Sequence, residues 1–403
     1  MYRSGQADLP LHYGRVPSWL YSRMRNLGGA IVEAIVLEYG PNEFLKRMSD
    51  PFWFQSLGCV LGMDWHSSGI TTSVLGALKA AINPLSDELG IYICGGRGKH
   101  SRKTPEELRN IGNIIGLDGN KLTHQSRLTA KIDSTAIQDG YQIYLHTFIL
   151  SKDGTWSVVQ QGMNENTGYA RRYHWHSENI TSFVEEPHTA IYGKPEGKIL
   201  NLTDRYAKRT REGIITISRE EPGRMMREIR KMRMPQHHDV RTENVNLRRM
   251  GSVLALSYEY QHSDFESLLL TEGLGPRTLQ SLTLVSEVIY GTPSRFYDPA
   301  RFSFAHGGKD GHPFPVPTRI YDESIRILHQ SVKKAKIGFY DKQKAIKKLH
   351  QISMDIEKNF NPGSNISPIL QHERQNSAKW GGKTVFDGSE KIKRNRSKQL
   401  SLF

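Results

Sequence analysis

The chain has 403 residues, enough for two or three domains that each bury a core. Its 55 Lys and Arg against 41 Asp and Glu give a net charge of +14, which favours a polyanionic partner, and nucleic acid is the commonest. No apolar run is long enough to span a membrane, and Cys59 and Cys94 are too few for a disulfide framework or a four-cysteine zinc site. The N-terminus shows no apolar signal segment, so we expect a cytoplasmic, nucleoid-associated protein.

The first region, residues 1–125, is predicted to be a mostly helical domain. Apolar residues recur at helical spacing in "SWLYSRMRNLGGAIVEAIVLEYGP" and again in "SSGITTSVLGALKAAI". A basic glycine loop, "GGRGKHSRKT", then precedes a helix start. The loop lacks the register of a nucleotide-binding P-loop, which argues against an NTPase. We expect Arg97 and Lys99 in this loop to contact phosphate.

Residues 126–220 are predicted to form a β-rich central domain. "DGYQIYLHTFIL" and "TWSVVQQGM" are rich in β-branched and aromatic residues, and "SKDG" between them is a turn signal. This pattern predicts an antiparallel hairpin that "YARRYHWH" extends. A later stretch, "GIITIS", also has some strand character.

Residues 221–358 return to helical spacing and are predicted to be a DNA-binding domain. Residues 359–398 have no periodicity and few apolar residues, so they are predicted to be a disordered linker before residues 399–403. The expected fold is therefore α+β, with a helical N-terminal region, a central antiparallel sheet, a helical C-terminal region and a disordered tail.

The strongest internal motif is "SLLLTEGLGPRTLQSL", residues 267–282. We expect Ser263 to cap a helix that breaks at the glycines, with a second helix beginning at Pro276. It resembles the helix-hairpin-helix motif of DNA glycosylases, ligases and repair nucleases, which binds the DNA backbone without reading bases. The resemblance implies DNA contacts at Gly273, Gly275, Arg277 and Thr278. The alternative is an ordinary helical hairpin that needs glycine for its geometry.

The last five residues place apolar side chains after a charged, poorly foldable segment. Gln399, Leu400, Ser401, Leu402 and Phe403 resemble the peptide by which bacterial polymerases and repair proteins dock on the DNA polymerase sliding clamp. An unstructured tether suits this role, because it delivers apolar anchors to a preformed groove. The resemblance implies the sliding clamp as a partner.

Several long stretches carry a second resemblance. They include "ADLPLHYGRVPSWL", "SDPFWFQSLGCVLGMDWHSSGITTSVLGALK", "SRLTAKIDSTAIQDGYQ" and "FSFAHGGKDGHPFPV". With them the chain, up to about residue 340, resembles domain-of-unknown-function family 763 of bacteria and archaea. This resemblance supplies no mechanism.

The best polar constellation surrounds the predicted hairpin. Asp133 and Asp139 are expected to hold Mg²⁺ or Mn²⁺, with Gln160 and Lys131 completing a catalytic site, because carboxylate and amide oxygens suit these ions. The arrangement is loosely similar to that of nucleases with a strand aspartate followed by Glu/Gln-x-Lys, but Gly162 stands where the lysine would be. The alternative is a hydrogen-bonded polar surface of a sheet.

These features favour a clamp-tethered DNA-binding protein of repair or replication-associated processing. Whether it is an enzyme stays open, and the leading candidate is a metal-dependent DNA nuclease. A DNA glycosylase or lyase is an alternative, with Tyr141, Trp156 or Trp175 stacking on a base. A non-catalytic DNA-binding adaptor is the third.

Overall fold

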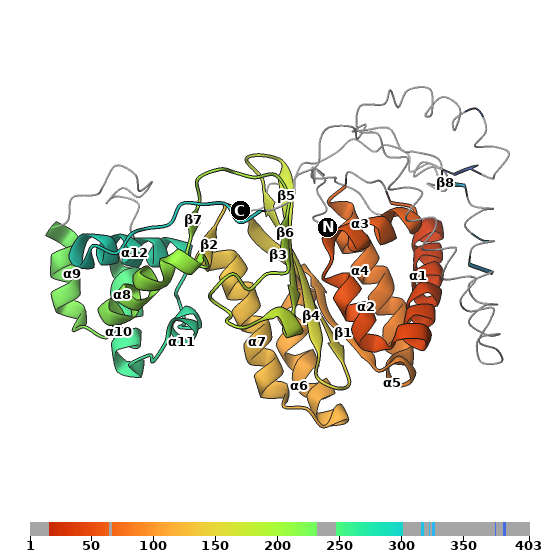
Figure 1. Cartoon of the computed structure of the whole chain (residues 1–403), viewed down its shortest axis with the longest axis horizontal. Helices are drawn as coiled ribbons and strands as arrows, with labels where there is room; N and C mark the ends of the chain where they lie inside the picture. The colour runs from red at the N-terminus through yellow and green to blue at the C-terminus, as the bar shows by residue number, and fades with distance from the viewer. Residues whose placement is uncertain are drawn as a thin grey trace, which may run out of the picture.

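A computed structural model describes residues 16–63, 67–231 and 247–300, with short pieces at 316–317, 322, 325–326, 375 and 382–383. The predicted clamp-binding peptide 399–403 lies outside the described residues, as does the predicted linker 359–398 apart from 375 and 382–383. Figure 1 shows the described part as a central sheet with helices on both sides, which confirms the α+β class.

The sheet has five strands in the order β1-β3-β4-β5-β6, and every neighbouring pair is antiparallel. The predicted hairpin is confirmed as β3 and β4, and "YARRYHWH" is β5. β1 comes from residues before 126, so the sheet is larger than the central region alone. The strands are β1 Ile91–Arg97, β3 Gln142–Ser151, β4 Trp156–Asn164, β5 Tyr169–His176 and β6 Ala190–Tyr192.

Four N-terminal helices cover one face of this sheet. They are α1 Ser18–Tyr39, α2 Pro41–Met48, α3 Pro51–Val60 and α4 Gly69–Ile82, followed by the short α5 Ser86–Leu89. Successive strand residues point to opposite faces, so Val159 packs with these helices while Val158 belongs to the core on the other side. Burial on both faces explains why β1 and β3 carry consecutive apolar residues, Ile91–Cys94 and Phe148–Leu150, rather than a simple alternation.

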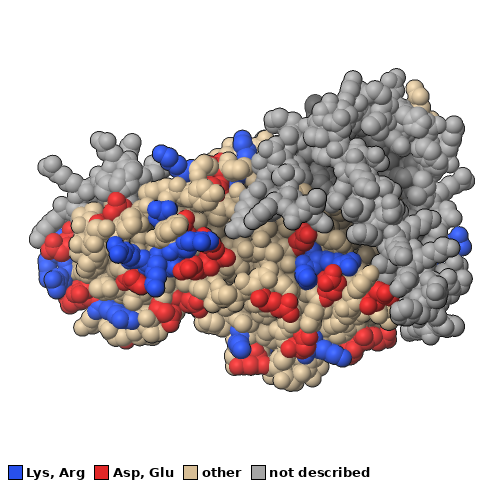
Figure 2. Space-filling view, in the orientation of Figure 1, with Lys and Arg blue, Asp and Glu red and all other residues tan. Residues whose placement is uncertain are grey.

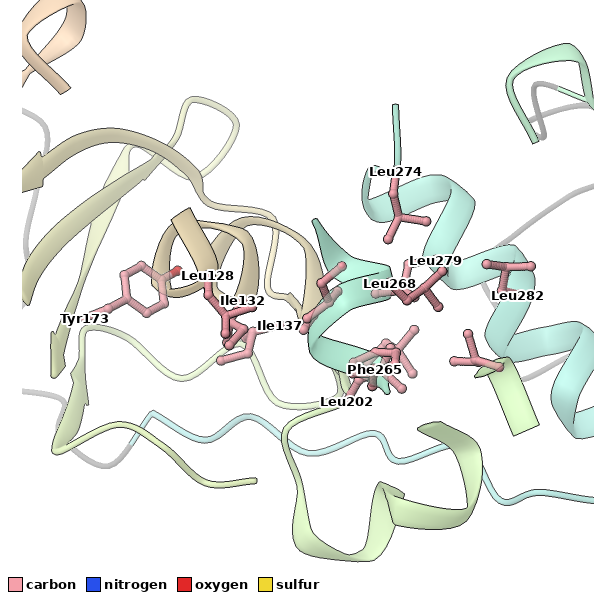
Figure 3. Close-up of a cluster of buried hydrophobic side chains, with 14 of the residues drawn as sticks. Leu128, Ile132, Ile137, Tyr173, Leu202, Phe265, Leu268, Leu274, Leu279 and Leu282 are labelled. Carbon is pink, nitrogen blue, oxygen red and sulfur yellow. The ribbon is translucent and has the colours of Figure 1, made fainter. Parts of the chain in front are cut away.

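Helices α6 Thr104–Ile115 and α7 Gly119–Lys131 lie against the opposite face, and the C-terminal helices pack beyond them (Figure 1). One apolar core runs from the sheet to these helices. Figure 3 shows Leu128, Ile132 and Ile137 between Tyr173 of the sheet and the leucines of the C-terminal helices. The C-terminal helices are α8 Lys208–Ser218, α9 Pro222–Lys231, α10 Leu247–Tyr260, α11 Phe265–Leu269 and α12 Pro276–Tyr290.

The strand character expected for "GIITIS" is wrong, because this stretch belongs to helix α8. The exposed positions of α8 are 208, 209, 212 and 216, which follow helical spacing, while Ile214 and Ile217 are fully buried in the core. Burial along one helical face therefore outweighs the β preference of three isoleucines.

Two further pairs of short strands are antiparallel. β2 Ile137–Gln138 pairs with β7 Leu200–Asn201, and β8 Val316–Pro317 pairs with β9 Gly382–Lys383. Residues Ile132–Ala136 form one turn of π-helix between α7 and β2, and residues Gly98–Lys103 form a 3₁₀ segment after β1. Among the helices described, none is both long enough and apolar enough to cross a membrane.

Candidate nucleic-acid interface and adjoining cavity

The predicted helical hairpin is present between α11 and α12. Gly273 has φ +80°, a left-handed conformation that side chains disfavour, and Gly275 is the N-cap of α12 before Pro276. The preceding helix is capped by Asp264, which accepts a hydrogen bond from the Ser267 amide at 2.8 Å; the expectation that Ser263 caps it was wrong. Aspartate directly before the helix is the better placed acceptor.

Three carbonyl groups of the hairpin accept hydrogen bonds from the protein body. Arg249 Nε donates to the Gly273 carbonyl at 2.9 Å, Lys131 Nζ to Leu274 at 2.5 Å, and Gln138 Nε2 to Pro276 at 2.8 Å. Leu274 itself is buried and points toward Leu279 and Leu268 (Figure 3). The three hydrogen bonds to its carbonyl groups and the burial of Leu274 therefore fix the hairpin against the rest of the protein.

The backbone N–H groups at the end of the hairpin lie at the N-terminus of helix α12. The first N–H groups of a helix have no acceptor within it, which applies here to Gly275, Arg277 and Thr278, while Pro276 has no N–H. Arg277 is exposed, and Thr278 is buried. Three of the predicted DNA contacts, Gly275, Arg277 and Thr278, therefore have backbone N–H groups at the first turn of α12, and Gly275 has no side chain to block a ligand there.

A cavity of about 1040 Å³ adjoins the hairpin. Pro276, Arg277 and Gln280 of α12 line one part of it. Further lining residues come from α7, the turn before β3, and strand β3. Four cations, Arg102, Arg127, Lys198 and Arg277, line the cavity, and Asp139 is the one acid among its described lining residues. The lining therefore favours an anion.

The loop after β1 supplies residues to this cavity, but not those that were predicted. Ser101 and Arg102 line it, whereas Arg97 and Lys99 are exposed outside its lining. The Arg97 guanidinium lies 5.6 Å from the centre of the Tyr144 ring. Among the aromatic residues considered for base stacking, Tyr141 lines the cavity, while Trp156 and Trp175 are buried in the core.

Asp133 and Gln160 do meet, although Asp133 lies in the π-helical turn and not in the hairpin. Gln160 Nε2 and Trp175 Nε1 donate to Asp133 Oδ2 at 2.5 and 3.0 Å, and His188 Nε2 bonds the other oxygen. Asp133 is fully buried. Burial raises the pKa of its carboxyl group, and the nearby His188 acts in the opposite direction.

Asp139 lies in a different environment, in the turn before β3. It accepts from the Tyr141 amide at 3.0 Å, Arg171 at 3.0 Å and the Tyr173 hydroxyl at 2.6 Å. Arg171 also forms a two-point ion pair with Asp298. Burial raises the pKa of Asp139 to about 6, against the opposing effects of Arg171 and Tyr173, and the nearby Asp298 carboxylate adds a smaller rise.

The carboxylates of Asp133 and Asp139 lie in two separate hydrogen-bond networks. Each carboxylate oxygen of Asp133 and Asp139 already accepts a hydrogen bond, and they share no donor. No group of three or more His, Cys, Asp or Glu side chains able to hold a metal occurs within the described residues. The Mg²⁺ or Mn²⁺ site stays a prediction. Lys131, expected beside it, instead contacts the hairpin.

Sequence reasoning missed the pair that lies closest to a reactive arrangement. Ser126 Oγ of α7 is 2.8 Å from His146 Nε2 of β3, and His146 Nδ1 is 2.9 Å from Gln160 Oε1 of β4. Both Ser126 and His146 line the cavity. The sheet register accounts for the His146–Gln160 contact, because these two residues are directly opposite each other on β3 and β4. That pairing could be read from the predicted hairpin, but the approach of α7 could not.

The comparisons with known proteins identify a family but no individual matching protein. No curated protein and no solved structure matches the chain. Residues 5–316 match the family model described as "Protein of unknown function (DUF763)", which confirms the resemblance seen in the sequence. This match covers more than half of the chain, and the protein therefore belongs to that family.

Proposed function

We propose that this protein binds DNA through the helix-hairpin-helix element and takes a phosphate or nucleotide of the bound strand into the adjoining cavity. The observation that carries the proposal is the position of four cations around a cavity that reaches the start of α12. Backbone donors at a helix N-terminus and nearby guanidinium groups suit phosphate oxygens without reading bases.

The charge of the whole chain supports the same partner. Its net charge is +14, and Figure 2 shows Lys and Arg side chains gathered over the C-terminal helices, with acidic side chains between them. A local cluster within a mixed surface favours contact with one stretch of backbone. We place the protein in DNA repair or replication-associated processing, with residues 399–403 recruiting it to the sliding clamp in the cytoplasm, at the nucleoid.

A salt titration tests DNA binding. Affinity for a labelled duplex should fall steeply with salt, because basic groups displace counterions from phosphates. Arg277→Ala should reduce the slope of log affinity against log salt by about one. Arg109→Ala also removes an exposed charge, from α6 and outside the cavity lining, and serves as the control. Equal slopes for both variants would remove the hairpin from the interface.

The class of activity needs a second experiment. Single-stranded, duplex, mismatched, flapped and uracil-containing DNAs should be incubated with the full chain in Mg²⁺, Mn²⁺ or EDTA. Cleavage that requires the ion, and that Asp133→Asn or Asp139→Asn abolishes, would favour the metal-dependent nuclease. Base release in EDTA would favour a glycosylase, and binding without a product would favour the adaptor.

A further inference from the structure

The hydrogen bonds around His146 fix which of its nitrogens carries the proton. Gln160 Nε2 donates to the Asp133 carboxylate at 2.5 Å, so the amide oxygen of Gln160 faces His146 Nδ1. The reverse orientation would set that oxygen against the carboxylate oxygen. Because an amide oxygen only accepts, Nδ1 of His146 must be the donor. Its Nε2 then has a free lone pair and accepts from the Ser126 hydroxyl.

This is the tautomer that a histidine base requires. A hydroxyl nucleophile becomes reactive when an adjacent base removes its proton, and a third group holds that base in orientation. Here Gln160 orients His146, and Asp133 orients Gln160 in turn. Burial lowers the pKa of His146 to about 4, so the imidazole is neutral near pH 7 and its lone pair is available.

Both side chains line the cavity despite their low exposure, 2% for Ser126 and 5% for His146. Arg127 follows Ser126 on α7 and Arg102 comes from the loop after β1, and both line the same cavity. Cations beside a nucleophile suit an electrophile that carries negative charge. A phosphodiester meets this requirement better than a neutral ester or amide.

We propose that Ser126 is a nucleophile for a phosphodiester of nucleic acid, with His146 as its general base and Gln160 and Asp133 as positioning residues. The choice of nucleic acid rests on the proposed function, whereas the nucleophile and base rest on the contacts around His146.

The step balances without a further reagent. Ser126 Oγ forms a bond to phosphorus while its proton passes to His146 Nε2. The bond from phosphorus to one nucleotide oxygen breaks, and that oxygen takes the proton from His146. The strand is then joined to Ser126 through phosphate. Water, or the hydroxyl just released, attacks phosphorus and frees the serine by the reverse proton transfers.

The test uses an alkyl fluorophosphonate, which traps an activated serine as the oxygen–phosphorus bond forms and fluoride leaves. The full chain should be labelled on the tryptic peptide 122–127, at Ser126, as mapped by mass spectrometry. Ser126→Ala should abolish this label, and His146→Gln should slow it by about 100-fold, the usual contribution of a general base. Ser134→Ala, a serine of the same cavity, should label at the wild-type rate.

If a variant fails to fold, labelling of the wild-type protein still tests the proposed nucleophile. Absence of label at Ser126 would overturn the assignment of the nucleophile, even if the chain binds DNA as proposed. Label that His146→Gln leaves unchanged would overturn the assignment of the base. A saturating single-stranded oligonucleotide should slow labelling. If Ser126 is labelled equally fast with and without DNA, the nucleophile stands and the phosphodiester substrate does not.

Discussion

The ammonium group of Lys131 donates to the Leu274 carbonyl at 2.5 Å, across 143 positions of the chain. Lys131 is the last residue of α7, and Leu274 stands between the two glycines of the hairpin. Burial lowers the pKa of Lys131, and so do the neighbouring charges of Arg249 and Arg127. The contact therefore joins the helix that carries Ser126 to the proposed DNA-binding element.

Replacing Lys131 by methionine should weaken DNA binding several-fold, because the Leu274 carbonyl loses its donor and the hairpin loses part of its support. The free energy of unfolding should fall by about 1 kcal/mol, as for one lost hydrogen bond. Lys121→Met, at an exposed position of the same helix, removes an equal charge and is the control. Equal DNA affinity for the two variants would show that Lys131 acts only through its charge.

Gly275→Val should lower DNA affinity at least tenfold while leaving stability within about 0.5 kcal/mol of wild type. Its φ of −132° and ψ of 177° suit a β-branched residue, and an added Cβ meets only Arg249 Nη2 at 3.6 Å. The new side chain would stand where a phosphate approaches. Fluorescence anisotropy and urea unfolding measure the two effects.

Gly273→Val should lower stability, in contrast to Gly275→Val. Its φ of +80° strains any side chain, so this variant should lose roughly 1–3 kcal/mol of stability. If Gly275→Val proved equally unstable, its loss of DNA affinity would say nothing about a phosphate.

His146 gives the fold a pH dependence. Its pKa is lowered to about 4 by burial, below the unfolded value near 6.5, so the unfolded chain binds the extra proton first. The stability linked to neutral His146 is complete above pH 6.5 and is lost as pH falls toward 4, by roughly 3 kcal/mol in all. In His146→Gln this part of the pH dependence should disappear from urea unfolding curves between pH 7.5 and 5. If the free energy of unfolding fell equally with pH in wild type and variant, His146 would not be the source of this pH dependence.

Deleting Gln399–Phe403 should abolish sliding-clamp binding and leave intrinsic DNA affinity unchanged. Leu402 and Phe403 are the expected anchors, each worth roughly 1.5–3 kcal/mol when buried in a groove. A peptide spanning residues 396–403 should compete for the clamp with about micromolar affinity, since ordering it offsets part of the gain. Its Leu402/Phe403 double-alanine version should be at least tenfold weaker. Equal competition by both peptides would exclude these anchors.

The elements with local signals were the ones that could be predicted. The β3–β4 hairpin follows from β-branched and aromatic residues on both sides of a turn signal, and the break at Gly273 follows from a left-handed turn that glycine permits. The partners of Asp133 were harder, because the π-helical turn reorients the chain after α7. Asp133 thereby reaches Gln160, while Asp139 remains in a turn and pairs with Arg171. The Ser126–His146 contact depends on how a helix packs on a sheet, which no local pattern records.

Helix α7 has a mechanical consequence for a strand lying across this surface. Ser126 and Lys131 are five residues apart on it, about 7.5 Å along a rigid axis, and Lys131 is bonded to the hairpin. A phosphate held on the hairpin and a phosphate beside Ser126 would therefore be kept at one constant separation. Helix α7 would thus set a fixed distance between the two phosphates, and the proposed cleavage at Ser126 should occur at one offset from the bound phosphate rather than over a range of positions.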